Sequence, residues 1–447
     1  MQTKSFTVNT DDTIKPFKKT IKVDSDKSQS IRSFLIGAIS QDISRVENVL
    51  ESDDVYSAIE CLKKLGVKIK KIKPKSYLIY GKGLGSLFAK KNLELNFGNS
   101  GTLARLLIGI ISTTPNLELR VKGDHSLNKR NMKKLIELMS NFGAIFLPKN
   151  RFNFPLKIIS TELPVGINYE AGSSAQLKSA VILAALNSFG TTVVTEKKKS
   201  RDHTENMLIK NNRVIKIKRK KFKIIKVFGK KNLNSFNINI PGDPSSAAFF
   251  TALTLLNKNS VLNIKNVGLN PTRTGFYELL KRHGARIKFK NIRKKNNEIF
   301  GDIQVKSSKI KPIKAGSEYY VKATDEYPIL FVVAALTKGV STFKGISDLA
   351  NKESNRIGEM QKILKQINIK SVVSNNEIKI YGKNIIKNNK KINVPNLGDH
   401  RICMSTLILS LLTGLKTKIK NFETVYTSAP SFLRIIKFLG GKFEIQK

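Results

Sequence analysis

Six segments of the chain repeat one arrangement, in which a short cluster of small or polar residues comes directly before an apolar run. Each run is long enough for about three turns of α-helix and is apolar on nearly every side, as expected for a buried helix. Ser, Asp, Asn and Gly in the clusters are residues that cap helix N-termini. The pattern therefore predicts six buried helices, which begin near Ser25, Asn99, Ser173, Gly242, Thr324 and Gly398.

These segments recur roughly every 70–80 residues, and such self-similarity indicates repeated structural units. Between them lie β-rich stretches and a second, more amphipathic helix, for example over residues 130–144 and 272–285. The sequence thus predicts an α/β (α+β) fold made of six copies of one unit. A chain of 447 residues exceeds the size at which a single core stops growing, so we expect two domains.

The polar helix starts also predict anion binding, because the N-terminus of a helix is electropositive and presents free N–H groups. With three units in each domain, the N-termini of these helices would lie on both walls of a cleft. Ordinary capping explains any single start, but six starts that also carry Lys, Arg, Asp or Gln favour a binding site.

The net charge of +47, from 80 basic and 33 acidic residues, has two interpretations. One is a nucleic-acid-binding surface. The other is compositional drift, because Lys, Asn and Ile are abundant throughout the chain. The densest stretch, residues 210–231, alternates apolar and basic positions, which is typical of a half-buried hairpin with a solvated face. We therefore favour drift, although a positive field would attract small anionic substrates.

Several classes of protein are not expected. The first thirty residues contain Asp11, Asp12, Lys18 and Lys19 and show no apolar signal-peptide core, so a soluble cytoplasmic protein is expected. The two cysteines and four histidines show no disulfide or metal-ligand spacing, so we expect no metal. The segment GKGLG at 81–85 opens no predicted helix and is interpreted as a hairpin turn rather than a dinucleotide loop.

Eleven short motifs occur in the order DKSQSIR, GNSGT, GDHSLNKRNM, GSSAQLKSA, SRDHTE, PGDPSSAAF, NPTRTG, TDEYPIL, KESNRI, GDHRICMS and TSAPSF. With them the chain resembles, over nearly its whole length, the class of 5-enolpyruvylshikimate-3-phosphate synthases typified by glyphosate-tolerant bacterial enzymes. The resemblance implies the two-domain enolpyruvyl transferase fold, with six βαβαββ repeats, three per domain, and a cleft between the domains. It places the chain crossings near Val23 and Ile240, which gives a discontinuous domain of residues 1–22 plus 241–447 and an inserted domain of residues 23–240.

The same resemblance implies the reaction. The enolpyruvyl group of phosphoenolpyruvate is transferred to the 5-hydroxyl of shikimate 3-phosphate by addition and elimination, and phosphate is released. This is a step of the shikimate pathway, which leads to chorismate and the aromatic amino acids. No cofactor, membrane or specific nucleic acid is implied, and a monomer is expected.

Both substrates carry a phosphate and a carboxylate, so a site for them needs several cations, preferably arginines. By resemblance, Lys27 contacts both substrates, and Gln176 reaches both as well. The residues expected to hold shikimate 3-phosphate are Ser28, Arg32, Ser174, Ala175, Gln176, Ser200, Arg201 and Lys352. The residues expected to hold phosphoenolpyruvate are Gly101, Arg130, Arg356 and Arg401, with Asn99 as a further candidate.

Two carboxylates match the family's catalytic positions. We assign Asp325 as the base for the 5-hydroxyl and Glu353 as the donor of a proton to the methylene carbon, with Lys27 close to both. Glu326, rather than Asp325, is the expected structural helix cap. His400 either hydrogen-bonds a substrate phosphate or orients Arg401.

The chain departs from the family pattern at three motif positions. Asn131 replaces the usual Pro, Asn355 replaces Asp, and Ala429 replaces Phe. These changes put affinity rather than reaction type in question. A lysine that other classes use near the C-terminus has no clear counterpart before Pro430. Tolerant members of the class carry Ala at the position of Gly101, so this chain is expected to be sensitive to glyphosate.

Three other functions fit the sequence less well. A UDP-N-acetylglucosamine enolpyruvyl transferase shares the fold and chemistry but uses a loop cysteine, and residues 109–130 contain none. An RNA-handling protein on a related repeat fold, such as an RNA 3′-phosphate cyclase, would suit the charge but needs a nucleophilic His in its own motif. A binding module without catalysis would not need Asp325 and Glu353 together.

Overall fold

The computed structural model describes residues 5–211, 213–219, 221–384, 386 and 390–447. The chain divides into two compact units. We call Met1–Asp24, Pro241–Lys294 and Ile299–Lys447 the terminal unit, and Ser25–Ile240 with Lys295–Glu298 the inserted unit. Each unit has a hydrophobic core of its own. None of the helices in the described residues is long and apolar enough to cross a membrane.

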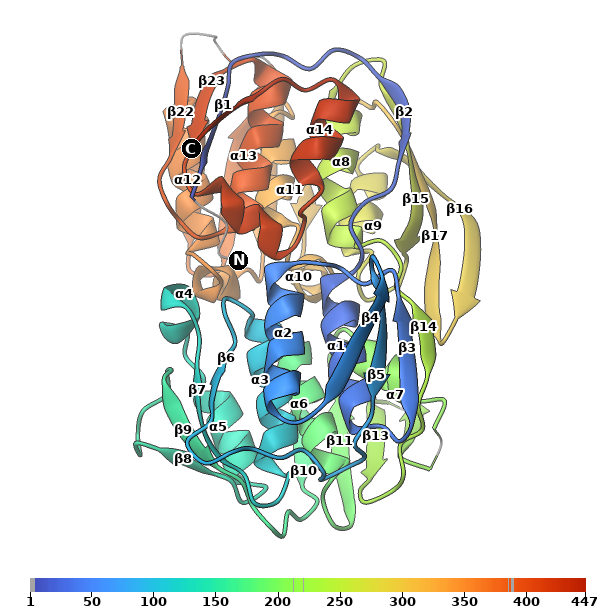
Figure 1. The fold of residues 1–447 in the computed structure, drawn as a ribbon. Helices are drawn as coiled ribbons and strands as arrows, with labels where there is room; N and C mark the ends of the chain where they lie inside the picture. The colour runs from blue at the N-terminus through green and yellow to red at the C-terminus, as the bar shows by residue number, and fades with distance from the viewer. Residues whose placement is uncertain (1–4, 212, 220, 385, 387–389) are drawn as a thin grey trace. The chain divides into compact units, whose positions relative to one another are not determined.

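The inserted unit contains three four-stranded sheets with one topology (Figure 1). In each sheet the first pair of strands is parallel and the other two pairs are antiparallel. In spatial order, the first sheet contains β14 (Asn237–Asn239), β3 (Ile43–Glu47), β5 (Ser76–Tyr80) and β4 (Lys68–Lys73). The second contains β6 (Glu94–Asn96), β7 (Glu118–Lys122), β9 (Leu156–Ile159) and β8 (Ile145–Leu147). The third contains β10 (Asn168–Ala171), β11 (Thr191–Glu196), β13 (Lys223–Phe228) and β12 (Ile215–Arg219).

Three of the predicted buried helices, α1 (Lys27–Ile39), α3 (Gly101–Ser112) and α6 (Ala175–Ala185), form the centre of the inserted unit. Helix α3 packs closely on α6 because Gly109 has no side chain; a Cβ there would lie 2.5 Å from the carbonyl oxygen of Ala180. The outer helices are α2 (Asp53–Lys64), α4 (His125–Asn128), α5 (Lys133–Ser140) and α7 (His203–Leu208).

The terminal unit repeats this design in three more sheets. In spatial order, one sheet contains β16 (Arg286–Lys295), β17 (Glu298–Lys306), β15 (Val261–Gly268) and β2 (Lys18–Ile21). Another contains β18 (Lys314–Ala315), β19 (Gly339–Lys344), β21 (Glu377–Gly382) and β20 (Ser371–Ser374). The last contains β22 (Lys391–Val394), β23 (Lys416–Ile419), β1 (Thr7–Thr10) and β24 (Glu444–Gln446). Strands β1 and β2 explain why the N-terminal segment belongs to this unit.

The other three predicted buried helices, α8 (Pro244–Leu256), α11 (Tyr327–Ala335) and α13 (His400–Thr413), pack against one another in the terminal unit (Figure 1). The remaining helices are α9 (Gly275–Arg282), α10 (Glu318–Ala323), α12 (Arg356–Gln366) and α14 (Phe432–Leu439), with two 3₁₀ turns, η1 (Ser347–Asn351) and η2 (Phe422–Thr427).

The predicted α/β fold of six repeats, three per unit, is confirmed in the described residues. The third repeat of the inserted unit shows the βαβαββ order most directly, since β10, α6, β11, α7, β12 and β13 follow one another along the chain. The first sheet is completed by a strand from far along the chain, because β14 pairs with β3 in parallel register, with Ile238 opposite Val46.

Five of the six buried helices have the side-chain caps that the polar clusters predict: Asp26, Ser100, Ser174, Asp243 and Asp399. Helix α11 is the exception. Glu326 occupies its N-cap position, as expected, but makes no side-chain capping hydrogen bond. Pro328, which lacks an N–H, removes one donor that would need a cap.

The basic stretch 210–231 forms the predicted hairpin, with β12 and β13 in antiparallel register; Asn212 and Lys220 of this stretch lie outside the described residues. The prediction of a hairpin turn at GKGLG is wrong, because β5 before it and β6 after it belong to different sheets. Gly81 instead lets the chain pass the end of α1: a Cβ there would lie 2.1 Å from the carbonyl oxygen of Ser40.

This glycine has equivalents in two other repeats. A Cβ at Gly229 would lie 1.7 Å from the carbonyl oxygen of Ser188, at the end of α6, and one at Gly382 would lie 2.0 Å from that of Thr337, at the end of α11. The N–H of the lysine that follows each glycine donates to a carbonyl near the end of the helix. The backbone just after these strands, β5, β13 and β21, therefore caps the C-terminus of the buried helix, and its close approach requires a residue without a side chain.

Candidate active site

Lys27 is the first residue of α1, where Asp26 caps the helix by accepting the N–H of Gln29 at 2.8 Å. The Nζ atom of Lys27 lies 2.9 Å from Oδ2 of Asp54, a buried carboxylate in the first turn of α2. This ion pair joins the N-terminal end of α1 to the first turn of α2. Sequence reasoning identified Lys27 but missed Asp54, which lies outside the motifs.

Arg32 follows about one turn later on α1 and is buried. Its Nη1 donates to the carbonyl oxygen of Ser28 at 3.1 Å, its Nε donates to Oγ1 of Thr204 at 3.0 Å, and its Nη2 donates to Oγ of Ser179 at 3.3 Å. These three acceptors are uncharged, so they orient the guanidinium group without neutralising it. The structure thus brings together Ser28 and Arg32 from α1 with residues of α6 and α7.

At the start of α3, Arg130 and Asn99 form a contact that the motifs do not reveal. Nη2 of Arg130 donates to Oδ1 of Asn99 at 2.8 Å, and Nδ2 of Asn99 donates to Oδ2 of Asp124 at 2.7 Å. Asn131 next to them is the residue that replaces Pro, and its Oδ1 accepts the N–H of Lys133 at the start of α5. The amide supplies a capping interaction at that helix start, so this departure is accommodated locally.

Arg105 is a cation that sequence reasoning missed. Its Nη1 donates to Oε1 of Gln176 at 2.9 Å and to the carbonyl oxygen of Gly101 at 3.1 Å, while Nε2 of Gln176 donates to Oγ1 of Thr102 at 3.0 Å. Arg105 thereby joins the starts of α3 and α6 and the predicted residues Gly101 and Gln176. The available signal was a single arginine inside the otherwise apolar run of residues 103–111.

The remaining candidates of the inserted unit lie at the start of α6 and in the segment before α7. Ser174 caps α6 by accepting the N–H of Leu177, and Ala175 is its first helical residue. Ser200 is buried and donates both its N–H and its hydroxyl to Oε1 of Glu196. Arg201 follows directly, between β11 and α7.

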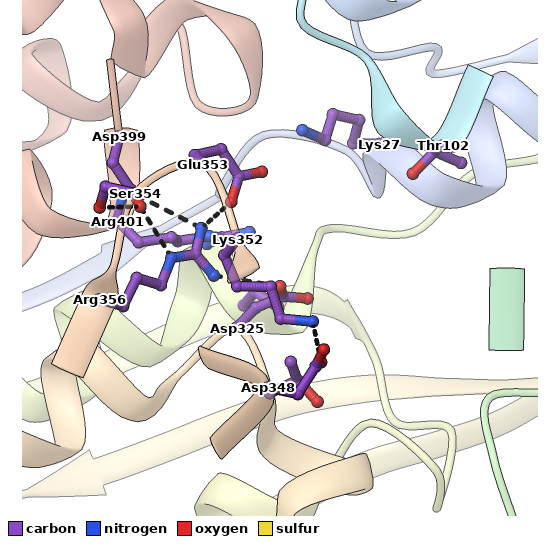
Figure 2. A network of polar contacts seen from close by, with 12 residues as sticks. Lys27, Thr102, Asp325, Asp348, Lys352, Glu353, Ser354, Arg356, Asp399 and Arg401 are labelled. Carbon is purple, nitrogen blue, oxygen red and sulfur yellow. Dashed lines mark hydrogen bonds and ion pairs between the residues drawn. The ribbon is translucent and has the colours of Figure 1, made fainter. Parts of the chain in front are cut away.

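The terminal unit gathers its candidates around Arg356, the first residue of α12 (Figure 2). Its side chain is 1% exposed and contacts three carboxylates: Nη2 lies 2.6 Å from Oε2 of Glu353, Nε lies 2.9 Å from Oδ2 of Asp399, and Nη1 lies 3.9 Å from Oδ1 of Asp325. Burial opposes the charge, but these carboxylates outweigh it and raise the pKa of Arg356 above its ordinary value. Both predicted catalytic carboxylates therefore contact one permanent cation.

The carboxylates Glu353 and Asp325 remain partly accessible, with side chains 19% and 26% exposed. Asn355 between Glu353 and Arg356 is the residue that replaces Asp, and its Oδ1 caps α12 by accepting the N–H of Gly358 at 3.0 Å. Asn and Asp serve this role about equally well, which explains why the position tolerates the change.

Asp399 is a third charged residue, after Asp54 and Arg105, that sequence reasoning did not assign. It is fully buried, caps α13 through the N–H of Arg401, receives Nε of Arg356, and accepts the hydroxyl of Ser354 at 3.0 Å. Its GDHR motif was read only for the neighbouring His400 and Arg401. Asp399 therefore fixes the start of α12 against the start of α13.

Arg401 and His400 begin α13, and both are buried. The guanidinium of Arg401 lies over the ring of Phe249 at 5.7 Å, while Nε and Nη1 have no hydrogen-bond partner in the part of the chain that the structure describes. Buried donors of this kind require an acceptor. A bound anion would supply one.

Lys352 is not joined to the Arg356 cluster by an ion pair among the described residues. Its Nζ contacts Oδ2 of Asp348 in η1 (Figure 2). The same oxygen accepts the hydroxyl of Tyr320 at 2.7 Å. Ala429, the third departure, is buried at the end of η2, where its N–H donates to the carbonyl oxygen of Val425.

A cavity of about 620 Å³ occurs elsewhere in the inserted unit. It lies beyond the C-terminal ends of α1 and α6 and is lined by residues that include Gln41, Lys82, Asn187 and Lys230. None of the candidate residues lines it. Within the residues that the structure describes, no group of three or more His, Cys, Asp or Glu side chains is arranged to hold a metal ion.

The two sets of groups suit chemistry on anionic substrates. In the inserted unit, helix N-termini and nearby arginines can bind phosphate and carboxylate groups. In the terminal unit, two partly exposed carboxylates beside a buried arginine can exchange protons with a bound molecule.

Known proteins are similar to this chain in sequence and in fold. The EPSP synthase (3-phosphoshikimate 1-carboxyvinyltransferase) family model matches residues 12–436. The 3-phosphoshikimate 1-carboxyvinyltransferases of Petrotoga mobilis and Bacillus subtilis are 38% and 36% identical, over 93% and 94% of this chain and 96% and 97% of theirs. EPSP synthase from Acinetobacter baumannii superimposes with a TM-score of 0.85 at 34% identity, over 99% of this chain and all of that one.

An enolpyruvyl transferase from Streptomyces tendae has the same fold, with a TM-score of 0.76 over 99% of both chains, but only 12% identity. That likeness concerns architecture alone. The family match, by contrast, spans nearly the whole sequence and rests on relatives well above 30% identity. The chain therefore belongs to the EPSP synthase family, the 3-phosphoshikimate 1-carboxyvinyltransferases.

Proposed function

We propose that the protein transfers the enolpyruvyl group of phosphoenolpyruvate to the 5-hydroxyl of shikimate 3-phosphate and releases phosphate. The observation that carries this function is the full-length match to the family. The contacts of Arg356 support the catalytic assignment, because they bring Glu353 and Asp325, the two carboxylates assigned to proton transfer, beside one buried cation.

For binding, we assign the phosphate and hydroxyl groups of shikimate 3-phosphate to the starts of α1 and α6, with Arg32, Gln176 and Arg201 as the main polar contacts and Lys352 as a further one. We assign phosphoenolpyruvate to Gly101, Arg130, Arg356 and Arg401. Nε and Nη1 of buried Arg401 have no acceptor among the described residues, which supports the second assignment. Lys27 is proposed to act on both substrates.

For catalysis, Asp325 accepts the proton of the 5-hydroxyl while Glu353 gives a proton to the methylene carbon of phosphoenolpyruvate. The oxygen then bonds to the neighbouring carbon, and a tetrahedral ketal forms. In the second half, the methyl group returns a proton to Glu353, the bond to phosphate breaks, and Asp325 passes its proton to the departing phosphate. Because the steps are balanced in protons and electrons, the proposal needs no redox cofactor. We also propose that the protein is a cytoplasmic monomer.

The test is to incubate the protein with phosphoenolpyruvate and either shikimate 3-phosphate or UDP-N-acetylglucosamine, and to measure released phosphate and the mass of the product. We expect phosphate only with shikimate 3-phosphate. Release with the nucleotide sugar alone would replace this function with the UDP-N-acetylglucosamine reaction, and release with neither acceptor would refute enolpyruvyl transfer to both.

A further inference from the structure

Four charged side chains form a closed cluster inside the inserted unit. Nζ of Lys178 on α6 lies 2.7 Å from Oε1 of Glu196 at the end of β11 and 2.7 Å from Oε1 of Glu205 on α7. Nζ of Lys223 at the start of β13 lies 3.0 Å from Oε1 of Glu205 and 3.4 Å from Oε2 of Glu196. The side chains of Lys178, Glu196 and Glu205 are almost fully buried, and that of Lys223 is 12% exposed.

The pKa values of Glu196, Glu205 and Lys223 are all shifted toward the charged form. Burial tends to raise the pKa of Glu196, but the neighbouring lysines and Ser200 outweigh it, so its pKa is lowered; the pKa of Glu205 is lowered by the same lysines against burial. The two glutamates in turn raise the pKa of Lys223 against its burial. Buried ion clusters are often no more stabilising than apolar residues of similar volume, so stability alone is a weak reason for this cluster.

Glu196 differs from the other three residues of the cluster in its contacts with Ser200. Oε1 of Glu196 accepts the N–H of Ser200 at 2.9 Å and its hydroxyl at 2.6 Å. The segment of residues 197–202 belongs to neither β11 nor α7, so no strand or helix ladder holds it. The carboxylate of Glu196 therefore holds the middle of this segment, next to Arg201.

These bonds also limit what Ser200 can do. Its N–H and its hydroxyl hydrogen both point to Glu196, so the side chain can offer a ligand only its oxygen lone pairs. A phosphate needs donors. Among the cations of this segment, Arg201 directly follows Ser200, so its placement depends most on this anchor.

We propose that Glu196 is a positioning residue: held by Lys178 and Lys223, it fixes Ser200 and thereby sets Arg201 for the phosphate of shikimate 3-phosphate. This inference rests on the proposed function. It predicts that Glu196 governs affinity for one substrate although it does not touch that substrate.

The cluster supplies a matched pair of variants. Glu196→Gln and Glu205→Gln each remove one buried carboxylate from the same two lysines, but only Glu196 contacts Ser200. We expect both to lower the melting temperature. Glu196→Gln should also raise KM and the calorimetric Kd for shikimate 3-phosphate about tenfold or more, because small displacements of a binding group are costly. In Glu205→Gln, KM and Kd for shikimate 3-phosphate should stay within about twofold of the wild-type values. In both variants, KM for phosphoenolpyruvate should also stay within about twofold of its wild-type value.

Equal increases in KM for shikimate 3-phosphate in the two variants, or none in Glu196→Gln, would overturn the proposal and leave the cluster a structural role. If Glu196→Gln does not fold, Glu196→Asp and Glu205→Asp, which keep the charge, are compared by the same criterion. Within the Glu196 series, partial recovery of affinity by Asp relative to Gln is expected. Failure of the wild-type protein to release phosphate from the two substrates would instead refute the proposed function.

Discussion

Nη2 of Arg356 lies 2.6 Å from Oε2 of Glu353, so the arginine assigned to phosphoenolpyruvate and the carboxylate assigned as proton donor form an ion pair. The pair is asymmetric, because Arg356 is buried and held by Asp399, whereas Glu353 is partly exposed. Arg356 can therefore stay in place while Glu353 exchanges protons. This relationship links substrate binding and proton transfer in one short segment.

Glu353→Gln should reduce turnover by ~10²–10⁴, the usual contribution of a general acid or base, because an amide cannot transfer the proton. The calorimetric Kd for shikimate 3-phosphate should remain close to that of the wild type, since no cation is removed. Glu359→Gln on α12, which removes a carboxylate paired with exposed Lys362, serves as the control. A Glu353→Gln enzyme with near wild-type turnover would contradict the assignment of the proton donor.

Arg356→Ala should destabilise the terminal unit, because it leaves the fully buried Asp399 without its main cationic partner. Removing one partner of a buried ion pair typically costs about 3–5 kcal/mol, which urea denaturation can measure. Lys362→Ala on the same helix removes an exposed cation and should change the free energy of unfolding by less than about 1 kcal/mol. Similar values for the two variants would show that Arg356 has no structural role.

Gly229→Ala should destabilise the inserted unit, because the new Cβ would lie 1.7 Å from the carbonyl oxygen of Ser188, a backbone atom that cannot move independently. Overpacking of this kind costs about 1–3 kcal/mol or more. Gly172→Ala is the control, since its added methyl group meets nothing within 4 Å. Equal melting temperatures for the two variants would refute the close approach at the end of α6.

The repeat could be predicted from sequence because buried helices with polar starts have a distinctive local pattern, as in residues 25–39. The path of the GKGLG segment could not be predicted, because glycine is required at position 81 by a close approach to Ser40, which lies far from it along the chain. Asp54 and Asp399 were missed for the same reason. A buried acidic residue resembles any N-terminal helix residue until its partners Lys27 and Arg356 are placed beside it.

Charge drift and nucleic-acid binding make different predictions for the protein in solution. If the net charge of +47 is drift, random DNA should bind weakly and dissociate by about 0.2 M salt, as purely electrostatic contacts do. Fluorescence anisotropy with labelled duplex DNA and single-stranded RNA across a salt series would measure this. Micromolar binding that persists at that salt would support a nucleic-acid role.

The last prediction concerns Gly101 at the start of α3. A Cβ there would lie 2.8 Å from Nη1 of Arg105 and 2.9 Å from Nη1 of Arg130. Both contacts are with the ends of flexible side chains, so Gly101→Ala should fold but displace the two guanidinium groups. Because Arg130 is assigned to phosphoenolpyruvate, KM for this substrate should rise.

Glyphosate is slightly longer than phosphoenolpyruvate, so the added methyl group should exclude the inhibitor more strongly than the substrate. We expect the wild-type enzyme to be inhibited competitively with phosphoenolpyruvate, and Gly101→Ala to show a larger rise in Ki for glyphosate than in KM. The measurement is phosphate release at several concentrations of phosphoenolpyruvate and inhibitor for both proteins. A wild-type enzyme indifferent to millimolar glyphosate would show that Asn131, beside Arg130, or another difference from the family sets the dimensions of this site instead.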